Sequence, residues 1–272
     1  MDPSKDQGSK NTALHHACLA GDLKRVTTIL SDGHDINARG MLKRTPVMLA
    51  AWKGHRKVLD FLLDKGADVG IVDGRHDSIL HLACVGGGVE IVKPILSYTT
   101  RVDINEKGNY GKTPIMNAAW TRHTDVLQLL VSKGADLSSA DDGGDSILHW
   151  ACVGGHAEMV KYVLSMKRFD INSRGVCERT PVMEAAVHGH DEVFHLIVRS
   201  GGDLTLADAK ARNILHLACR GGNLEIVKYV LSKHIVDINS RDQMGNTAVM
   251  DATVQRHREM VNLLVSKGAH SR

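Results

Sequence analysis

The stretches Thr45-Pro46-Val47-Met48-Leu49-Ala50-Ala51 and Thr113-Pro114-Ile115-Met116-Asn117-Ala118-Ala119 follow one pattern. Thr before an apolar run suits the N-cap of a helix, and Pro at the next position needs no backbone donor. Segments of the same pattern begin near eight positions, 33 to 35 residues apart: 12, 45, 78, 113, 146, 180, 213 and 247. A period of this kind indicates a repeat architecture.

Further residues recur within each period. Ser78-Ile79-Leu80-His81-Leu82-Ala83 opens the third segment, and Lys65-Gly66-Ala67-Asp68 closes the second. Apolar residues at helical spacing, such as Val126, Leu127 and Leu130, indicate a second helix in each segment. From about Asn11 to Ala269 the chain resembles the ankyrin repeat family, whose unit is a turn plus two helices. The resemblance implies an all-α solenoid of paired antiparallel helices with projecting β-hairpin turns.

The domain organisation follows from the repeats. Residues 1–10 are expected to form a polar tail, and residues 11–272 a single array of eight repeats around one continuous core. A longer period is superimposed on the first. Odd repeats carry Leu-His with a Cys three residues after the His, whereas even repeats carry Met in place of that His. The unit of duplication is therefore a pair of repeats.

Composition excludes several classes of function. A net charge of +3 without a run of like charges argues against nucleic-acid binding. No apolar stretch approaches the roughly 18 residues of a membrane span. The five cysteines are an odd, scattered set, and no signal-peptide pattern is evident at the N-terminus, so a reducing interior is expected. We predict a cytoplasmic protein, with the nucleus as the alternative.

Pairs of His and Cys at i, i+3 are the candidate metal ligands: His15/Cys18, His81/Cys84, His149/Cys152 and His216/Cys219. A zinc site needs four ligands, commonly from two close pairs, and these pairs recur two repeats apart. We therefore expect no metal and no cofactor. The resemblance implies instead that each His bonds backbone in the adjoining turn and that each Cys replaces a small buried Ala.

Catalytic and phosphate-binding patterns are missing from the sequence. No Gly-x-Ser-x-Gly elbow or His-Glu-x-x-His occurs. Gly111-Lys112-Thr113 is followed by Pro114, and Glu106 stands where a phosphate loop needs glycine. We expect a protein that is not an enzyme.

The resemblance implies that a partner protein or peptide docks on the concave face, made by hairpin tips and first helices. Transferred position by position, the candidate protein-binding residues are Leu42, Trp52, Arg75, Tyr110, Lys112, Trp120, Arg179, His188, Lys210, Arg212 and Arg220. Exposed Trp, Tyr and Arg are enriched in binding hot spots. The alternative, that both Trp pack flat on neighbouring helices, stays open. The expected function is an interaction scaffold or adaptor, or alternatively the substrate-recognition part of a larger enzyme or ligase assembly.

Charges at the hairpins suggest two further hypotheses. Arg44, Asp77, Lys112, Asp145 and Arg179 alternate in sign at equivalent positions, which predicts a ladder of exposed ion pairs. Arg212 would break the ladder, leaving a positive patch with Arg179, near Lys210 and Arg220. The alternative is solvated charges without partners.

Four Asp-Ile-Asn sequences, ending at Asn37, Asn105, Asn172 and Asn239, resemble asparagines that are hydroxylated in the family. The alternative is that each Asn bonds its own turn.

Overall fold

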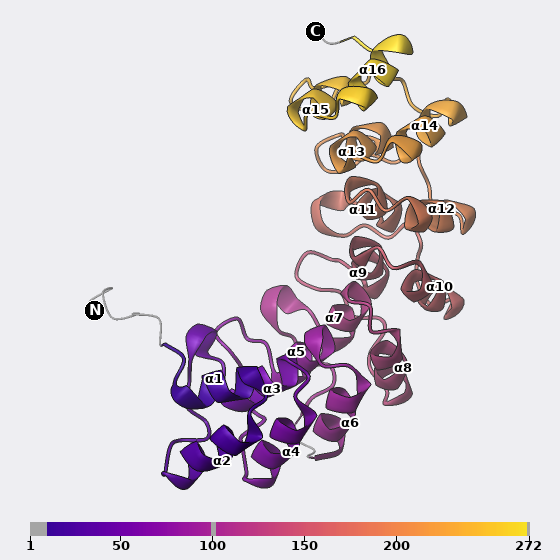
Figure 1. Cartoon of the computed structure of the whole chain (residues 1–272). Coiled ribbons are helices and arrows are strands. Elements are labelled where there is room, and N and C mark those ends of the chain that lie inside the picture. The colour runs from indigo at the N-terminus through magenta and orange to yellow at the C-terminus, as the bar shows by residue number, and fades with distance from the viewer. Residues whose placement is uncertain (1–9, 99–101, 271–272) are drawn as a thin grey trace, which may run out of the picture. The chain divides into compact units, whose positions relative to one another are not determined.

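The structure is a computed structural model that describes residues 10–98 and 102–270. Within these ranges the chain forms sixteen α-helices and three short 3-10 turns, with no β-strand (Figure 1). Apart from Lys10, the predicted polar tail at residues 1–10 lies outside the described residues, as do residues 271–272 at the end of the predicted array. Each repeat segment holds two helices, so the all-α fold expected from the resemblance is confirmed.

Two compact units make up the chain, unit 1 at residues 1–141 and unit 2 at residues 142–272. Each unit holds four of the eight repeat segments. The single continuous array over residues 11–272 stays a prediction.

In unit 1 the first helix of every repeat packs on the first helix of the next, and the second helices pack likewise. The helices are α1 (Ala13–Ala20), α2 (Leu23–Ser31), α3 (Pro46–Trp52), α4 (Arg56–Asp64), α5 (Ile79–Gly86), α6 (Val89–Tyr98), α7 (Pro114–Trp120) and α8 (Thr124–Ser132).

Unit 2 repeats this two-layer arrangement, with first helices against first helices and second against second (Figure 1). Its helices are α9 (Ile147–Gly154), α10 (Ala157–Ser165), α11 (Pro181–Val187), α12 (Asp191–Arg199), α13 (Ile214–Gly221), α14 (Leu224–Lys233), α15 (Ala248–Val254) and α16 (Arg258–Ser266).

Packing between repeats, rather than intrinsic helix stability, holds these elements. Helices of 7 to 10 residues are too short to be stable alone in water. The N-cap Thr45 and the N1 residue Pro46 start α3, and residues 46–51 are all buried. In the second helices only one stripe is buried, such as Val126, Leu127 and Leu130 of α8. The core therefore lies between the two helix layers and is completed by the neighbouring repeats.

Tight turns, here called fingers, join the second helix of one repeat to the first helix of the next. The fingers before even repeats are closed by backbone bonds from Gly40 N to Arg44 O (2.9 Å) and from Gly108 N to Lys112 O (2.8 Å). They contain the 3-10 turns η1 (Met41–Lys43), η2 (Asn109–Gly111) and, in unit 2, η3 (Val176–Glu178). The predicted β-hairpins are thus tight turns, and among the described residues one isolated bridge joins Ala207 to Asn213.

Close approach of the preceding repeat explains the glycine at the first position of three fingers that lead into even repeats, Gly40, Gly108 and Gly175. A Cβ on Gly108 would lie 2.4 Å from Asp77 Oδ1 and 2.8 Å from His81 Nε2. A side chain there would push apart two repeats that are hydrogen-bonded to each other.

Gly108→Ala is therefore expected to lower the free energy of unfolding of the full chain by about 1–3 kcal/mol, because the added methyl overpacks this contact. Urea titration followed by circular dichroism measures the change. Gly70→Ala is the matched control, since the nearest atom to a Cβ there is Asp68 Oδ1 at 3.3 Å. Equal losses in the two variants would contradict the role of Gly108.

Candidate functional site

The histidine in the first helix of each odd repeat binds the finger that leads into the following even repeat. His81 Nδ1 accepts from Ser78 N at 3.1 Å, and His81 Nε2 lies 3.0 Å from Lys112 O in the next finger. The ring therefore donates from Nε2 to the carbonyl, as a neutral imidazole. Equivalent bonds join the other three histidines to the next finger: His15 to Arg44 O, His149 to Arg179 O and His216 to Asn246 O. The role that the resemblance implied for these histidines is confirmed.

The paired cysteines pack in the core. Cys18, Cys84, Cys152 and Cys219 are buried free thiols, and Cys177 is exposed. Burial raises the pKa of the Cys18 thiol to about 12, which opposes the thiolate that a metal needs. No group of three or more His, Cys, Asp or Glu that could hold a metal occurs among the described residues. The absence of bound zinc stays a prediction.

The Asp-Ile-Asn segments join successive repeats, which differs from the predicted bond within one turn. Asp35 Oδ1 accepts from Asn37 N at 2.9 Å and closes the turn. The Asn37 side chain reaches the next repeat instead, where its Oδ1 accepts from Asp68 N at 2.9 Å. The other three asparagines accept in the same way from the next repeat, at Asp136 N, Asp203 N and His270 N. This bridging bond accounts for their recurrence.

The predicted ladder of alternating charges is wrong at Arg44, Asp77 and Arg179. Arg44 pairs with Asp73 at 3.0 Å, and Asp77 Oδ1 accepts from the backbone Asn109 N. Asp145 Oδ1 likewise accepts from Val176 N. A carboxylate at the end of a finger thus binds the next finger's backbone, because the close contact between fingers leaves that N–H without another partner.

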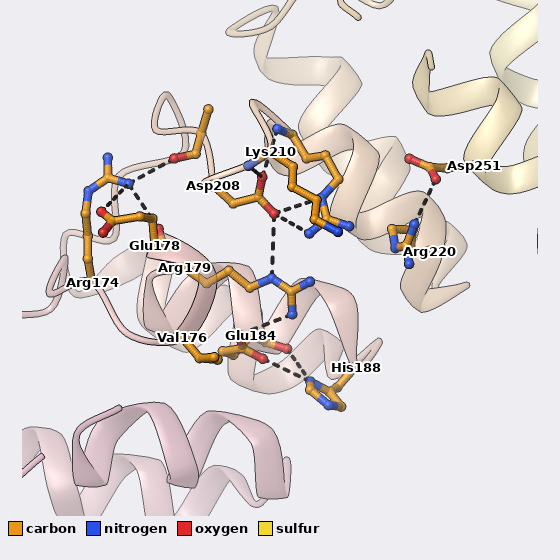
Figure 2. A network of polar contacts seen from close by, with 12 residues as sticks. Arg174, Val176, Glu178, Arg179, Glu184, His188, Asp208, Lys210, Arg220 and Asp251 are labelled. Carbon is orange, nitrogen blue, oxygen red and sulfur yellow. Dashed lines mark hydrogen bonds and ion pairs between the residues drawn. The ribbon is translucent and has the colours of Figure 1, made fainter. Parts of the chain in front are cut away.

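The predicted positive patch is also wrong, because Asp208 forms ion pairs with both Arg212 and Arg179, the second of which is drawn in Figure 2. Asp208 Oδ2 is 2.6 Å from Arg212 Nη2 and 3.7 Å from Arg179 Nε. Arg212 is only 5% exposed, which removes it from the surface available to a partner. Burial alone would raise the pKa of Asp208, but hydrogen bonds from Arg212 and Lys210 outweigh it and hold that pKa below its ordinary value.

Two further acids on the first helices of unit 2 complete the network in Figure 2. Glu184 on α11 is 3% exposed. Its Oε1 lies 3.4 Å from Arg179 Nη1, and its Oε2 lies 3.5 Å from His188 Nδ1. Asp251 on α15 pairs with Arg220 at 3.1 Å, and burial raises the pKa of its carboxyl. Lys210 is exposed on its finger. Arg179, His188 and Arg220 thus lie within ion-pair distance of acids of the same unit.

Sequence reasoning missed Asp208, Glu184 and Asp251. A signal was present for the last two, since each is an acid at the fourth residue of an otherwise apolar first helix, where α3 has Leu49. Asp208 had no such signal, because its partners depend on how the finger folds.

Most candidate residues of unit 1 are exposed, at finger tips and at the end of α7. Trp120 at the end of α7 is 43% exposed, with Lys112 Nζ 5.6 Å from its ring centroid. Tyr110 and Leu42 at two finger tips are 71% and 46% exposed, and Arg75 on the finger between them is exposed as well.

Trp52 is half-buried, so that part of its ring packs on a neighbouring repeat and part is exposed to a partner. Lys53 Nζ and Arg44 Cζ lie 4.1 Å and 5.3 Å from its ring centroid. A Cβ on Gly86 of the next repeat would lie 3.1 Å from Trp52 Cδ1, so one edge packs on that repeat. Trp52 is thus partly a packing residue, whereas Trp120 lies on the surface.

Comparisons with known proteins agree with this architecture. The family described as "Ankyrin repeats (3 copies)" matches residues 1–73, 66–141, 138–208 and 182–272. The chain is 27% identical to a human protein named transient receptor potential cation channel subfamily A member 1, over 94% of this chain and 27% of that protein.

Two other proteins have a similar sequence identity to this chain. Ankyrin repeat and KH domain-containing protein mask-1 of Caenorhabditis elegans is 28% identical, over 95% of this chain and 10% of its own length. The probable 26S proteasome regulatory subunit p28 of Saccharomyces cerevisiae is 25% identical, over 82% of this chain and 98% of the subunit. The chain thus spans a small part of the first two relatives and nearly all of the third. None of the described helices is long and apolar enough to cross a membrane.

Asp208→Ala is expected to lower the free energy of unfolding by about 3–5 kcal/mol, because it leaves the buried Arg212 without its carboxylate. Asp242→Ala is the matched control, since Asp242 accepts the same finger amides, Met244 N and Asn246 N, but holds no arginine. Its expected loss is about 1 kcal/mol. Urea unfolding measures both, and similar losses would show that the arginine pair adds nothing.

His15 makes stability depend on pH. Burial lowers its pKa, against the opposing effect of its bond to Arg44 O, so the folded chain binds fewer protons than the unfolded chain. The stability that His15 contributes is complete above its unfolded pKa of about 6.5 and is lost as the pH falls below it. His15→Gln should therefore reduce the pH dependence of the unfolding free energy below pH ~6.5, by up to about 1.4 kcal/mol per pH unit. Urea titrations across this range test it with His34→Gln, at an exposed position, as control, and an unchanged slope in His15→Gln would refute it.

Proposed function

The chain belongs to the ankyrin repeat family, and on that premise we propose that it binds another protein through one face of unit 1. This face, here called the finger face, consists of Leu42, Tyr110, Trp120 and the exposed part of Trp52. The observation that carries the proposal is the exposure of Trp120 beside Lys112. An exposed Trp with a cation over its ring presents a rigid apolar surface next to a charge, which is typical of binding hot spots.

The comparison between units supports the choice of unit 1. The candidate cations Arg179, Arg212 and Arg220 of unit 2 are engaged with acids of the same unit. Large aromatic residues at finger tips and first-helix ends occur only in unit 1, among the described residues. A partner would gain more from burying these side chains than from displacing ion pairs that are already formed.

The proposed role is an interaction scaffold or adaptor in the cytoplasm, and it assigns no catalytic step and no cofactor to this chain. A second role is favoured by one relative. The yeast protein is named as a regulatory subunit of the 26S proteasome, and the match covers nearly all of it. The corresponding alternative for this chain is the recognition part of a larger enzyme assembly, with the same finger face as its docking surface.

Trp120→Ala is expected to weaken binding of a captured and then purified partner by about tenfold or more, because it removes an exposed anchor. Trp52→Ala should weaken it too, with some loss of stability. Affinity capture with mass spectrometry identifies the partner, and isothermal titration calorimetry then measures each variant.

The control is Val254→Ala, which truncates a 77% exposed residue at the equivalent helix-end position in unit 2. Its affinity should equal that of the unchanged chain. If Trp120→Ala keeps full affinity, or if it unfolds, the assignment of the finger face is wrong.

A further inference from the structure

The finger tips of the even repeats hold apolar residues in an unfavourable backbone conformation. Leu42, Tyr110 and Cys177 occupy the middle of η1, η2 and η3 with φ of 55°, 56° and 57°. This left-handed region brings Cβ close to the backbone and disfavours every residue except glycine and, less strongly, asparagine. A bulky side chain at such a position costs free energy that glycine would avoid.

Contacts within unit 1 do not recover this cost. Tyr110 is 71% exposed and Leu42 is 46% exposed, so neither buries most of its side chain. The finger does accept glycine, since Gly111 follows Tyr110 with φ of 70°. Strained residues are typical of functional sites, where the side chain itself is needed. Among the described non-glycine residues at positive φ, Leu42 and Tyr110 carry the large apolar side chains, and a partner that buries them would offset the strain.

Hydrogen bonds join three consecutive fingers of unit 1. They place the tips Leu42 and Tyr110 on one line with the finger at residues 73–77, and we call the surface made by Leu42, Lys43, Arg75 and Tyr110 the strip. Gly74 N donates to Leu42 O at 2.6 Å, and Asn109 N donates to Asp77 Oδ1 at 3.0 Å. The finger at residues 73–77 therefore lies between the tips. Packed helices are about 8–10 Å apart, which puts Leu42 and Tyr110 roughly 16–20 Å apart. An extended chain covers that distance with about five or six residues.

The exposed charges of this strip are basic. Lys43 and Arg75 are exposed, with Arg75 on the middle finger. The acids of the same finger are engaged inside the structure, since Asp73 is buried against Arg44 and Asp77 holds the amide of Asn109. A ligand that follows the strip from Leu42 to Tyr110 thus meets apolar, basic and apolar side chains in turn.

We propose that this strip binds an extended acidic segment of the partner protein, with two apolar side chains about six residues apart. One apolar side chain contacts Leu42 and the other contacts Tyr110, while carboxylates between them face Arg75 and Lys43. The inference rests on the proposed function and specifies the chemistry of the partner. Complementary charge sets the register and the association rate, and the two apolar contacts supply most of the affinity.

The probe is a fluorescein-labelled synthetic peptide of about a dozen residues, made of Asp, Glu, Ser and two Leu spaced by about six residues. Fluorescence anisotropy with the full chain at low salt measures its affinity. A peptide with the two Leu adjacent, and one with Lys in place of the acids, are expected to bind about tenfold more weakly or not at all.

Glycine substitutions separate binding from folding. Leu42→Gly and Tyr110→Gly are each expected to lower peptide affinity by about tenfold, while urea unfolding shows equal or greater stability because the strain is relieved. Cys177→Gly is the matched control, since it relieves the same strain in unit 2 and should leave affinity unchanged. Arg75→Glu should also weaken binding and reduce its salt dependence.

The inference is overturned if the acidic peptide does not bind, if Leu42→Gly and Tyr110→Gly bind it as well as the unchanged chain, or if they unfold. If a single-stranded oligonucleotide of similar length binds with the same affinity as the acidic peptide, the inference is overturned too, because the strip would then recognise negative charge alone. If the peptide does not bind but the affinity for a captured partner still falls in Trp120→Ala, the proposal of an acidic segment is rejected. The proposed function is kept in that case.

Discussion

The neutral imidazole of the odd repeats is the interaction on which the rest of the structure depends. In the first, third and fifth repeats one ring nitrogen accepts from the N-cap amide of its own helix, and the other donates to a carbonyl of the next finger, as at His81 with Ser78 N and Lys112 O. Each such ring satisfies an N-cap N–H that would otherwise be buried without a partner, and it adds a second hydrogen bond to a carbonyl oxygen that already accepts from the finger's own glycine, as Lys112 O does from Gly108 N. In the seventh repeat His216 Nδ1 lies 2.8 Å from the side-chain oxygen of the N-cap residue Asn213 instead. The ring thereby fixes both the start of a helix and the position of the finger beside it.

The even repeats use a different connection, which explains why the unit of duplication is a pair. Where a His would stand, Met48 and Met116 offer only a weak sulfur acceptor. The following finger is held instead by its own Asp, which binds finger amides with one oxygen and an arginine with the other, as Asp73 does with Arg44. Charged groups in the fingers thus stabilise the contacts between repeats, whereas the exposed apolar tips can contact other molecules.

The sequence predicted the helices well because their period repeats eight times and every cap and apolar stripe agrees with it. It predicted the charges poorly. From their positions in the sequence, Arg212 and Asp77 are expected to be surface charges. In the structure Arg212 is buried against Asp208, and Asp77 accepts a hydrogen bond from the backbone N–H of Asn109. The role of Arg212 depends on how its own finger folds, and the role of Asp77 depends on a tight contact with a finger 32 residues away in sequence. The exposure of Tyr110 and Trp120 agreed with the prediction because their positions follow directly from the repeat register.

In this account a framework of hydrogen-bonded fingers presents exposed apolar and aromatic side chains of unit 1 to a partner. Hydrogen–deuterium exchange of the full chain, with and without a bound partner, tests that claim most directly. The account predicts slower exchange in the fingers at residues 40–44, 73–77 and 108–112, with α2, α4, α6 and α8 unchanged. Slower exchange confined to those second helices, or to unit 2, would contradict it.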